Sequence, residues 1–183
     1  MSQVRAALRK PVADATSDSP PSVSGASRAT WRAVLAEAIG PARHVVDLEG
    51  ATGEWRHLLE QNGCFLLEPT HALRGPVHGA LIARHLLSRA REPERLPAVW
   101  LDLLEPGGRI ILLESTHRGL FRKRRGLFAP KRPTDPLAPY RRGLAPADAA
   151  LLLEASGYVG IRAFALPVPA SASAHYLMSA RKR

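Results

Sequence analysis

The sequence predicts an α/β fold with mostly parallel strands, and three observations carry that prediction. Short apolar runs at 44–48, 64–68 and 109–114 alternate with amphipathic helical segments, which is typical of βαβ units. The first run ends in Asp47 and enters a glycine-containing turn before a helix, an arrangement that brings a strand end and a helix N-terminus to one ligand. The third follows an amphipathic helix and a Pro106-Gly107-Gly108 turn.

The composition excludes several classes of protein. At 183 residues the chain is long enough for one domain with a real core. Its single cysteine, Cys64, excludes an internal disulfide framework, and no Cys/His set has zinc spacing, so no metal site is expected. No apolar run approaches the ~20 residues needed to cross a bilayer, and the N-terminus lacks the apolar region of a signal peptide. We therefore expect a cytoplasmic protein.

The net charge of +10 predicts affinity for an anionic partner without identifying it. Aromatic residues are only 5% of the chain, and no RNA-stacking motif or helix-turn-helix signature accompanies the charge. Much of the charge lies in the Pro-rich segment 115–143. This segment is either a solvated loop or lid, or a binding segment in which 118–142 contacts an acidic protein, a phosphorylated substrate or RNA.

The first elements follow from local signals. Residues 1–28 are Ser/Pro-rich and are expected to form a flexible tail before a domain at 29–183. Thr30 is expected to cap a helix that Gly40 ends, and the apolar face of that helix has helical spacing. The strand at 44–48 then leads to a helix over 54–62 whose inward residues are Trp55, Leu58 and Leu59.

The second strand, 64–68, is expected to be buried on both faces, as parallel strands are. Glu68 at its end lies about 20 residues after Asp47, the spacing at which a carboxylate can bind ribose hydroxyls. A solvated glutamate at a strand end is the competing interpretation. Residues 69–80 leave room for one connection and for no further strand.

The middle of the chain is ambiguous. Residues 81–84 form either a third strand followed by a short helix at 85–90, or part of a single helix over 80–90. The later signals are clearer: an amphipathic helix reaches Leu104, a strand spans 109–114, and Pro146 starts a helix that Gly157 ends. Two last strands are expected at about 159–166 and 175–180.

Four stretches, in this order, resemble a class I S-adenosylmethionine-dependent methyltransferase of the small-molecule, methyltransferase type 11-like kind. The resemblance covers about 30–183, and the Pro-Gly-Gly stretch is its most characteristic part. The stretches are the turn Val46-Asp47-Leu48-Glu49-Gly50-Ala51-Thr52-Gly53, the strand end Leu67-Glu68-Pro69, the segment Leu103-Leu104-Glu105-Pro106-Gly107-Gly108-Arg109-Ile110, and the helix end Leu151-Leu152-Leu153-Glu154-Ala155-Ser156-Gly157-Tyr158.

The resemblance implies a Rossmann-like, doubly wound, mostly parallel sheet with an antiparallel terminal strand. It implies S-adenosylmethionine as cofactor and transfer of its sulfonium methyl to a small-molecule acceptor held in line. The implied cofactor-binding residues are Asp47, Glu49, Gly50, Ala51, Gly53 and Glu68. His85 would lie near the methyl group as a candidate base, although a surface histidine is the competing interpretation.

The sequence departs from the family pattern in two ways. Glu49 and Ala51 replace the first and second turn glycines, and Glu49 brings a carboxylate near that of the cofactor. Arg43 and Arg56 are the candidates to compensate this charge, and the sequence contains no signal that either does. The short 69–80 connection predicts a sheet that lacks one edge strand and ends at the second strand. An alternative therefore stays open: a catalytically inactive, methyltransferase-like scaffold that binds a protein or nucleic acid.

Overall fold

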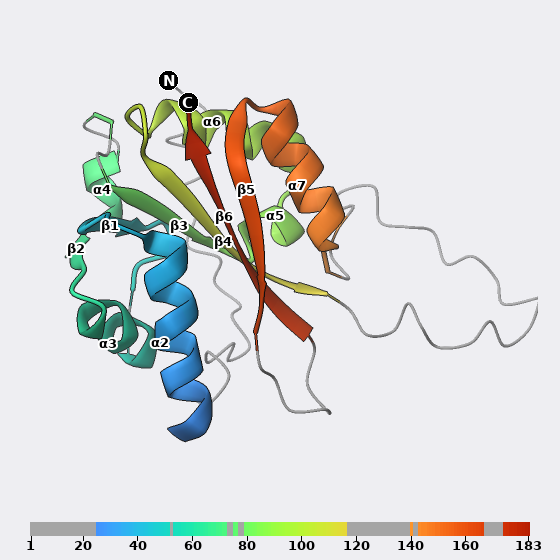
Figure 1. The fold of residues 1–183 in the computed structure, drawn as a ribbon. Helices are drawn as coiled ribbons and strands as arrows, with labels where there is room; N and C mark the ends of the chain where they lie inside the picture. The colour runs from blue at the N-terminus through green and yellow to red at the C-terminus, as the bar shows by residue number, and fades with distance from the viewer. Residues whose placement is uncertain are drawn as a thin grey trace, which may run out of the picture.

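The computed structural model describes residues 25–51, 53–72, 75–76, 79–116, 140, 143–166 and 174–183. Their centre is a six-stranded sheet with the order β2-β1-β3-β4-β6-β5 (Figure 1). The strands are β1 (His44–Asp47), β2 (Phe65–Leu67), β3 (Ala80–Arg84), β4 (Arg109–Thr116), β5 (Tyr158–Ala165) and β6 (Ala174–Lys182).

The sheet has a parallel half and an antiparallel half. β1 pairs in parallel with β2 and with β3, and β3 pairs in parallel with β4. β6 lies between β4 and β5 and is antiparallel to both. The predicted Rossmann-like, mostly parallel sheet with an antiparallel terminal strand is confirmed.

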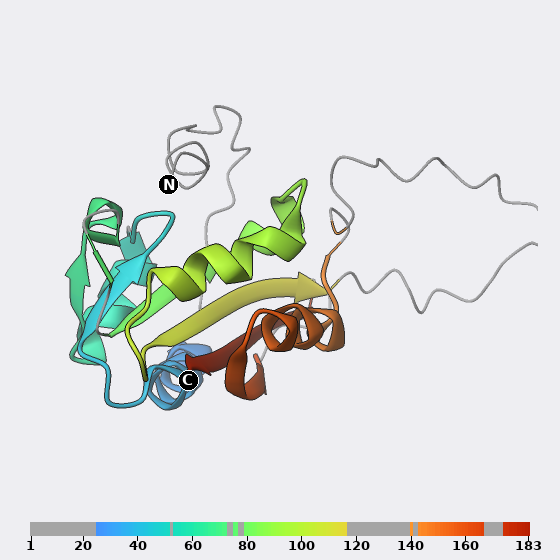
Figure 2. The same cartoon turned by 90° about the horizontal axis from the view of Figure 1, so that it is seen from above.

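Helices cover both faces of the sheet. On one face Trp31 and Leu35 of α2 (Gly25–Ile39) and Trp55 of α3 (Gly53–Gln61) share a buried cluster with Val45 and Ile111. The opposite cluster joins the sheet to α5 (Leu86–Arg89), α6 (Leu96–Asp102) and α7 (Pro146–Ala155). The described residues also include α4 (Pro69–Ala72) and the 3₁₀ turn η1 (Pro93–Arg95). Figure 2 shows β4 running between α6 on one side and α2 on the other.

The first helix begins earlier than the sequence indicated. α2 starts at Gly25, inside the stretch expected to be a tail, so Thr30 lies within the helix and does not cap it. A tertiary contact accounts for the longer helix, since Arg28 in its first turns donates a hydrogen bond of 2.8 Å to Glu54 of α3. Such contacts are invisible to local sequence signals.

The second strand was wrongly expected to be buried on both faces. β2 is the outer strand on its side of the sheet, and the Phe65 side chain is 65% exposed. The single short connection from β2 to β3 contains α4 and no strand among its described residues, which agrees with the predicted lack of an edge strand. Among the described strands, β2 therefore has a neighbour on one side only.

The ambiguity at 80–90 is resolved in favour of a strand followed by a short helix. The side chains of Ala80 to Ala83 are buried, because β3 has a partner on each side. At the entry to this strand, a Cβ placed on Gly79 would lie 1.7 Å from the carbonyl oxygen of His44. Only glycine lets the two chains approach so closely.

Most of the basic segment 115–143 lies outside the described residues, so its binding of an acidic protein or RNA stays a prediction. The structure does describe both ends of this segment. The Leu144 amide donates a hydrogen bond of 3.1 Å to the Ser115 carbonyl, which ties the end of β4 to the chain leading into α7. Within the described part of the chain, no helix has the length and hydrophobicity of a membrane span.

Candidate functional site

The carboxyl ends of the parallel strands bring the candidate residues to one edge of the sheet. Asp47 ends β1, Glu68 follows β2 directly, and Arg84 ends β3. A cavity of about 210 Å³ lies at this edge. Four of the predicted cofactor-binding residues line this cavity, namely Asp47, Gly50, Ala51 and Glu68. The other lining residues are Arg56, Leu66 and Leu67.

The turn after β1 keeps glycine where its backbone needs it. Gly50 and Gly53 have φ values of 81° and 53°, in the left-handed region that disfavours other residues. Glu49 and Ala51, which replace the other two turn glycines, do not have positive φ. Neither substitution therefore strains the turn. In addition, a Cβ on Gly50 would meet nothing within 4 Å, which leaves space above the turn.

Asp47 is the organising carboxylate of the turn. Its side chain is 2% exposed, and its oxygens accept hydrogen bonds from the Trp55 indole at 2.8 Å and from the Glu49 amide at 3.0 Å. The Arg84 guanidinium lies 3.0 Å from the same carboxylate. Burial raises the pKa of Asp47, and the charge of Arg84 opposes that rise. Asp47 thus fixes the turn, the start of α3 and the end of β3 to one another.

Glu49 is paired with arginines other than the two that the sequence suggested. Its carboxylate lies 3.2 Å from Nη1 of Arg89 and 3.9 Å from Nε of Arg84, not against Arg43 or Arg56. Burial raises the pKa of Glu49, and the two arginines oppose the rise. The extra negative charge of the turn is therefore balanced within the site.

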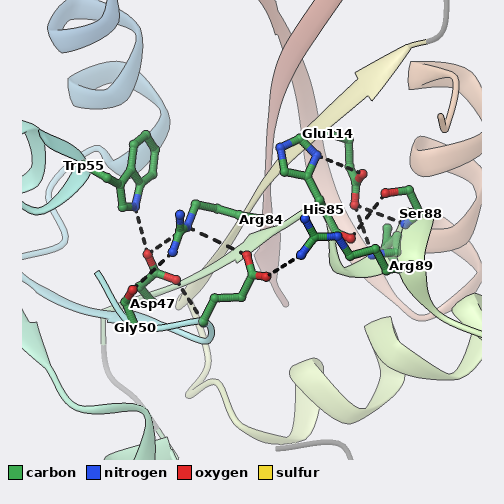
Figure 3. A network of polar contacts seen from close by, with 10 residues as sticks. Asp47, Gly50, Trp55, Arg84, His85, Ser88, Arg89 and Glu114 are labelled. Atoms are coloured by element: carbon green, nitrogen blue, oxygen red, sulfur yellow. Dashed lines mark hydrogen bonds and ion pairs between the residues drawn. The ribbon is translucent and has the colours of Figure 1, made fainter. Parts of the chain in front are cut away.

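His85 lies next to a second buried carboxylate. It follows β3 with a φ of 53°, an uncommon value for a residue other than glycine. Its Nδ1 is 3.8 Å from Oε2 of Glu114, a fully buried side chain of β4 (Figure 3). The other oxygen, Oε1, accepts hydrogen bonds from the amides of Leu87 and Ser88. The His175 ring lies 5.7 Å from that of His85.

The Glu114 carboxylate is only half satisfied. Oε2 is buried and has no hydrogen-bond partner among the described residues. Buried polar atoms usually have partners, so an orphaned one deserves a functional explanation. A carboxylate beside an imidazole can orient the ring and stabilise its protonated form.

The structure thus groups the predicted residues into two neighbouring sets. One set lines the cavity, and the other consists of His85 with its carboxylate. The sequence resemblance placed residues around Ala83 to His85 near the methyl group without giving Arg84 a role, and it missed Arg89 and Glu114. Strand register brings Glu114 to the site, because Arg84 lies opposite Leu113 in the β3–β4 pairing and Glu114 is the next residue. Arg89 comes from α5, the helix that follows β3.

The fold has clear structural neighbours. The 1,6-didemethyltoxoflavin-N1-methyltransferase from Burkholderia thailandensis, solved with 1,6-didemethyltoxoflavin and S-adenosylhomocysteine, is 17% identical with a TM-score of 0.58, over 86% of this chain and 78% of that one. An S-adenosylmethionine-dependent methyltransferase from Thermotoga maritima is 12% identical with a TM-score of 0.51, over 86% and 89%. The chain therefore shares its Rossmann-like fold with these two methyltransferases.

Fold and activity are separable in this group of structures. The cyclase SpnF is equally similar, with a TM-score of 0.54 and 14% identity over 86% of this chain and 81% of that one. Searches by sequence add no assignment, since no family model matches and no curated protein matches. Function therefore has to be inferred from the site itself.

Proposed function

We propose that the protein binds S-adenosylmethionine and transfers its methyl group to a small-molecule acceptor. The observation that carries this proposal is the cavity at the ends of β1 and β2, where the glycine turn, Asp47 and Glu68 meet. Glu68 is exposed at the rim of this cavity and its carboxylate would accept hydrogen bonds from the ribose hydroxyls. Gly50, which lines the cavity and has open space above it, would allow close approach of the ligand to the backbone.

When bound, the cofactor supplies an electrophilic methyl group on its sulfonium sulfur. The protein has to hold the acceptor in line with this group and to exclude competing nucleophiles. The acceptor's proton needs a destination, and His85 is the candidate to accept it. Glu114 would keep the ring oriented and would stabilise the charge that the ring gains.

The alternative of an inactive scaffold was motivated by Glu49 and by the missing edge strand. The pairing of Glu49 with Arg84 and Arg89 weakens the first motive, because the turn carries no uncompensated carboxylate. The backbone at Glu49 and Ala51 also has no need of glycine. Neither substitution is then a reason for the cavity to reject a nucleoside.

A calorimetric titration of the full chain with S-adenosylmethionine tests the proposal. We expect micromolar binding that weakens about tenfold or more in Glu68→Ala, because a charged hydrogen-bond acceptor contributes roughly 1.5–3 kcal/mol. Glu154→Ala is the matched control, since Glu154 is an exposed glutamate of α7, a helix that does not line the cavity. Absence of binding at millimolar cofactor would exclude the proposed function.

A further inference from the structure

Two arginines converge on one carboxylate beside the cavity. Arg84, at the end of β3, and Arg89, at the end of α5, both lie within ion-pair distance of Glu49. Glu49 directly precedes Gly50, which lines the cavity. A pair of guanidinium groups therefore lies at the margin of the cavity. Both are paired with the carboxylate of Glu49, a side chain of the turn.

Arg84 is held in place independently of Glu49. Besides its ion pair with Asp47, it donates a hydrogen bond of 3.2 Å to the carbonyl of Gly50, and its guanidinium lies 5.7 Å from the centre of the Trp55 ring. Its side chain is 19% exposed. Its Nε is buried and lies 3.0 Å from the Asp47 carboxylate. Arg84 is thus a preorganised cation whose position does not depend on Glu49.

Glu49 is the less firmly held partner. Its contact with Arg84 is long, at 3.9 Å, and its contact with Arg89 involves an arginine whose side chain is 51% exposed. If another carboxylate replaced Glu49, the number of ion pairs would stay the same. Glu49 would then move into water, which offsets the cost of its burial.

We propose that Arg84 and Arg89 form a carboxylate-binding clamp that Glu49 closes when no ligand is bound. Guanidinium groups are suited to this role because their donors match the two oxygens of a carboxylate. The inference rests on the proposed function and deepens it: the carboxylate is that of the amino-acid part of the cofactor. The clamp makes the site select nucleosides that carry a carboxylate over nucleosides that lack one.

Two probes separate this selectivity from nucleoside binding as such. S-adenosylhomocysteine carries the amino-acid carboxylate, whereas 5′-methylthioadenosine has the same adenosine and thioether sulfur without it. Both are titrated calorimetrically into the full-length chain and into Arg89→Ala and Glu49→Gln. Arg89 is preferred to Arg84 because Arg84 also holds Asp47. Arg95→Ala is the matched control, since Arg95 is a similarly exposed arginine that pairs with Glu92 at 2.9 Å.

We expect Arg89→Ala to weaken S-adenosylhomocysteine binding by about five- to tenfold and to leave 5′-methylthioadenosine binding within about twofold, as for a partly screened charged contact. Glu49→Gln should strengthen S-adenosylhomocysteine binding alone, because the competing charge is removed. Arg95→Ala should change neither. Equal effects of Arg89→Ala on both ligands, or no effect on either, overturn the clamp while nucleoside binding stands. Failure of both ligands to bind the unmodified chain overturns the clamp and the proposed function together.

Discussion

Two tyrosines are buried, and their hydroxyl groups make no hydrogen bond among the described residues. Tyr158 and Tyr176 are 3% and 5% exposed, and neither hydroxyl has a hydrogen-bond partner among the described residues. Burial raises the pKa of both phenols, and the charges of Asp102 near Tyr158 and of Glu114 and Asp148 near Tyr176 add to the rise. Both therefore stay neutral in the folded protein at pH values where the unfolded chain ionises them.

The sign of the resulting pH dependence follows from linkage. The unfolded tyrosines lose their protons near pH 10, whereas the folded ones keep them. The contribution of the two neutral tyrosines to the free energy of unfolding is therefore fully present below pH 10, and it is lost as the pH rises above 10. At pH 11 the loss is on the order of 1 kcal/mol for each tyrosine.

We predict that the double variant Tyr158→Phe, Tyr176→Phe loses less stability at high pH than the unmodified protein. At pH 7 its free energy of unfolding should be unchanged or higher by up to about 1 kcal/mol, because no hydrogen bond is removed. Urea unfolding at pH 7 and pH 11 measures both values, with Tyr140→Phe as the control. Parallel losses in the two proteins would show that the phenols do not cause the pH dependence.

At the residue scale the sequence predicted the carboxylates of the cavity better than their partners. Asp47 and Glu68 follow apolar runs, so strand ends could be inferred for them. Arg84 and Glu114 are separated from the turn by tens of residues, and only strand pairing brings them to it. The compensation of Glu49 was assigned to the wrong arginines for the same reason, since proximity along the chain favoured Arg43 and Arg56.

At the scale of elements, the entry to β3 depends on one glycine. A methyl group on Gly79 would overlap the His44 carbonyl, which belongs to the neighbouring strand and has no flexible atoms to move aside. Gly75 offers the matched comparison, since a Cβ there would meet nothing within 4 Å. Both glycines lie in the same connection between β2 and β3.

We predict that Gly79→Ala lowers the free energy of unfolding by about 3 kcal/mol or more, as overpacking against backbone does. Gly75→Ala should stay within about 0.5 kcal/mol of the unmodified protein. Chemical denaturation of the three proteins measures the difference. If Gly79→Ala changes the free energy of unfolding only slightly, the backbones of β1 and β3 can move apart near Gly79 while the two strands stay paired.

The elements themselves were predicted well where a local signal fixes them. The helix before Pro106, the strand after Gly108 and the helix beginning at Pro146 all form as expected. The predictions were wrong where contacts with other helices or strands determine the length or burial of an element. α2 extends back to Gly25 because it packs on α3, and β2 is exposed because no described strand lies outside it.

At the scale of the whole molecule, much of the excess positive charge lies in one segment, which we do not expect the stability of the fold to require. Residues 118–138 contain seven of the 26 lysines and arginines, and Asp135 is their only acidic residue. The contact of Leu144 with Ser115 already closes the ends of this segment. The length of a closed loop affects stability weakly, by about 0.6 kcal/mol for each doubling.

We predict that replacing 118–138 with a short Gly/Ser linker leaves the free energy of unfolding within about 1 kcal/mol of its original value. The same variant should elute from a heparin column at lower salt, because fewer lysines and arginines remain to neutralise the charges of the polyanion. Thermal denaturation and the elution position are the measurements. A loss of several kcal/mol would show that the replaced residues belong to the core, and unchanged elution would place the polyanion affinity elsewhere.

The position of β6 has a consequence for the order of folding. β5 precedes β6 in the chain, yet it joins the sheet only through β6. During synthesis β5 therefore waits without a partner until the nine residues of β6 have left the ribosome, and β4 keeps one side open for the same time. The nascent chain thus exposes an unpaired central strand until β6 has emerged, a stage at which binding by a chaperone would protect it from aggregation.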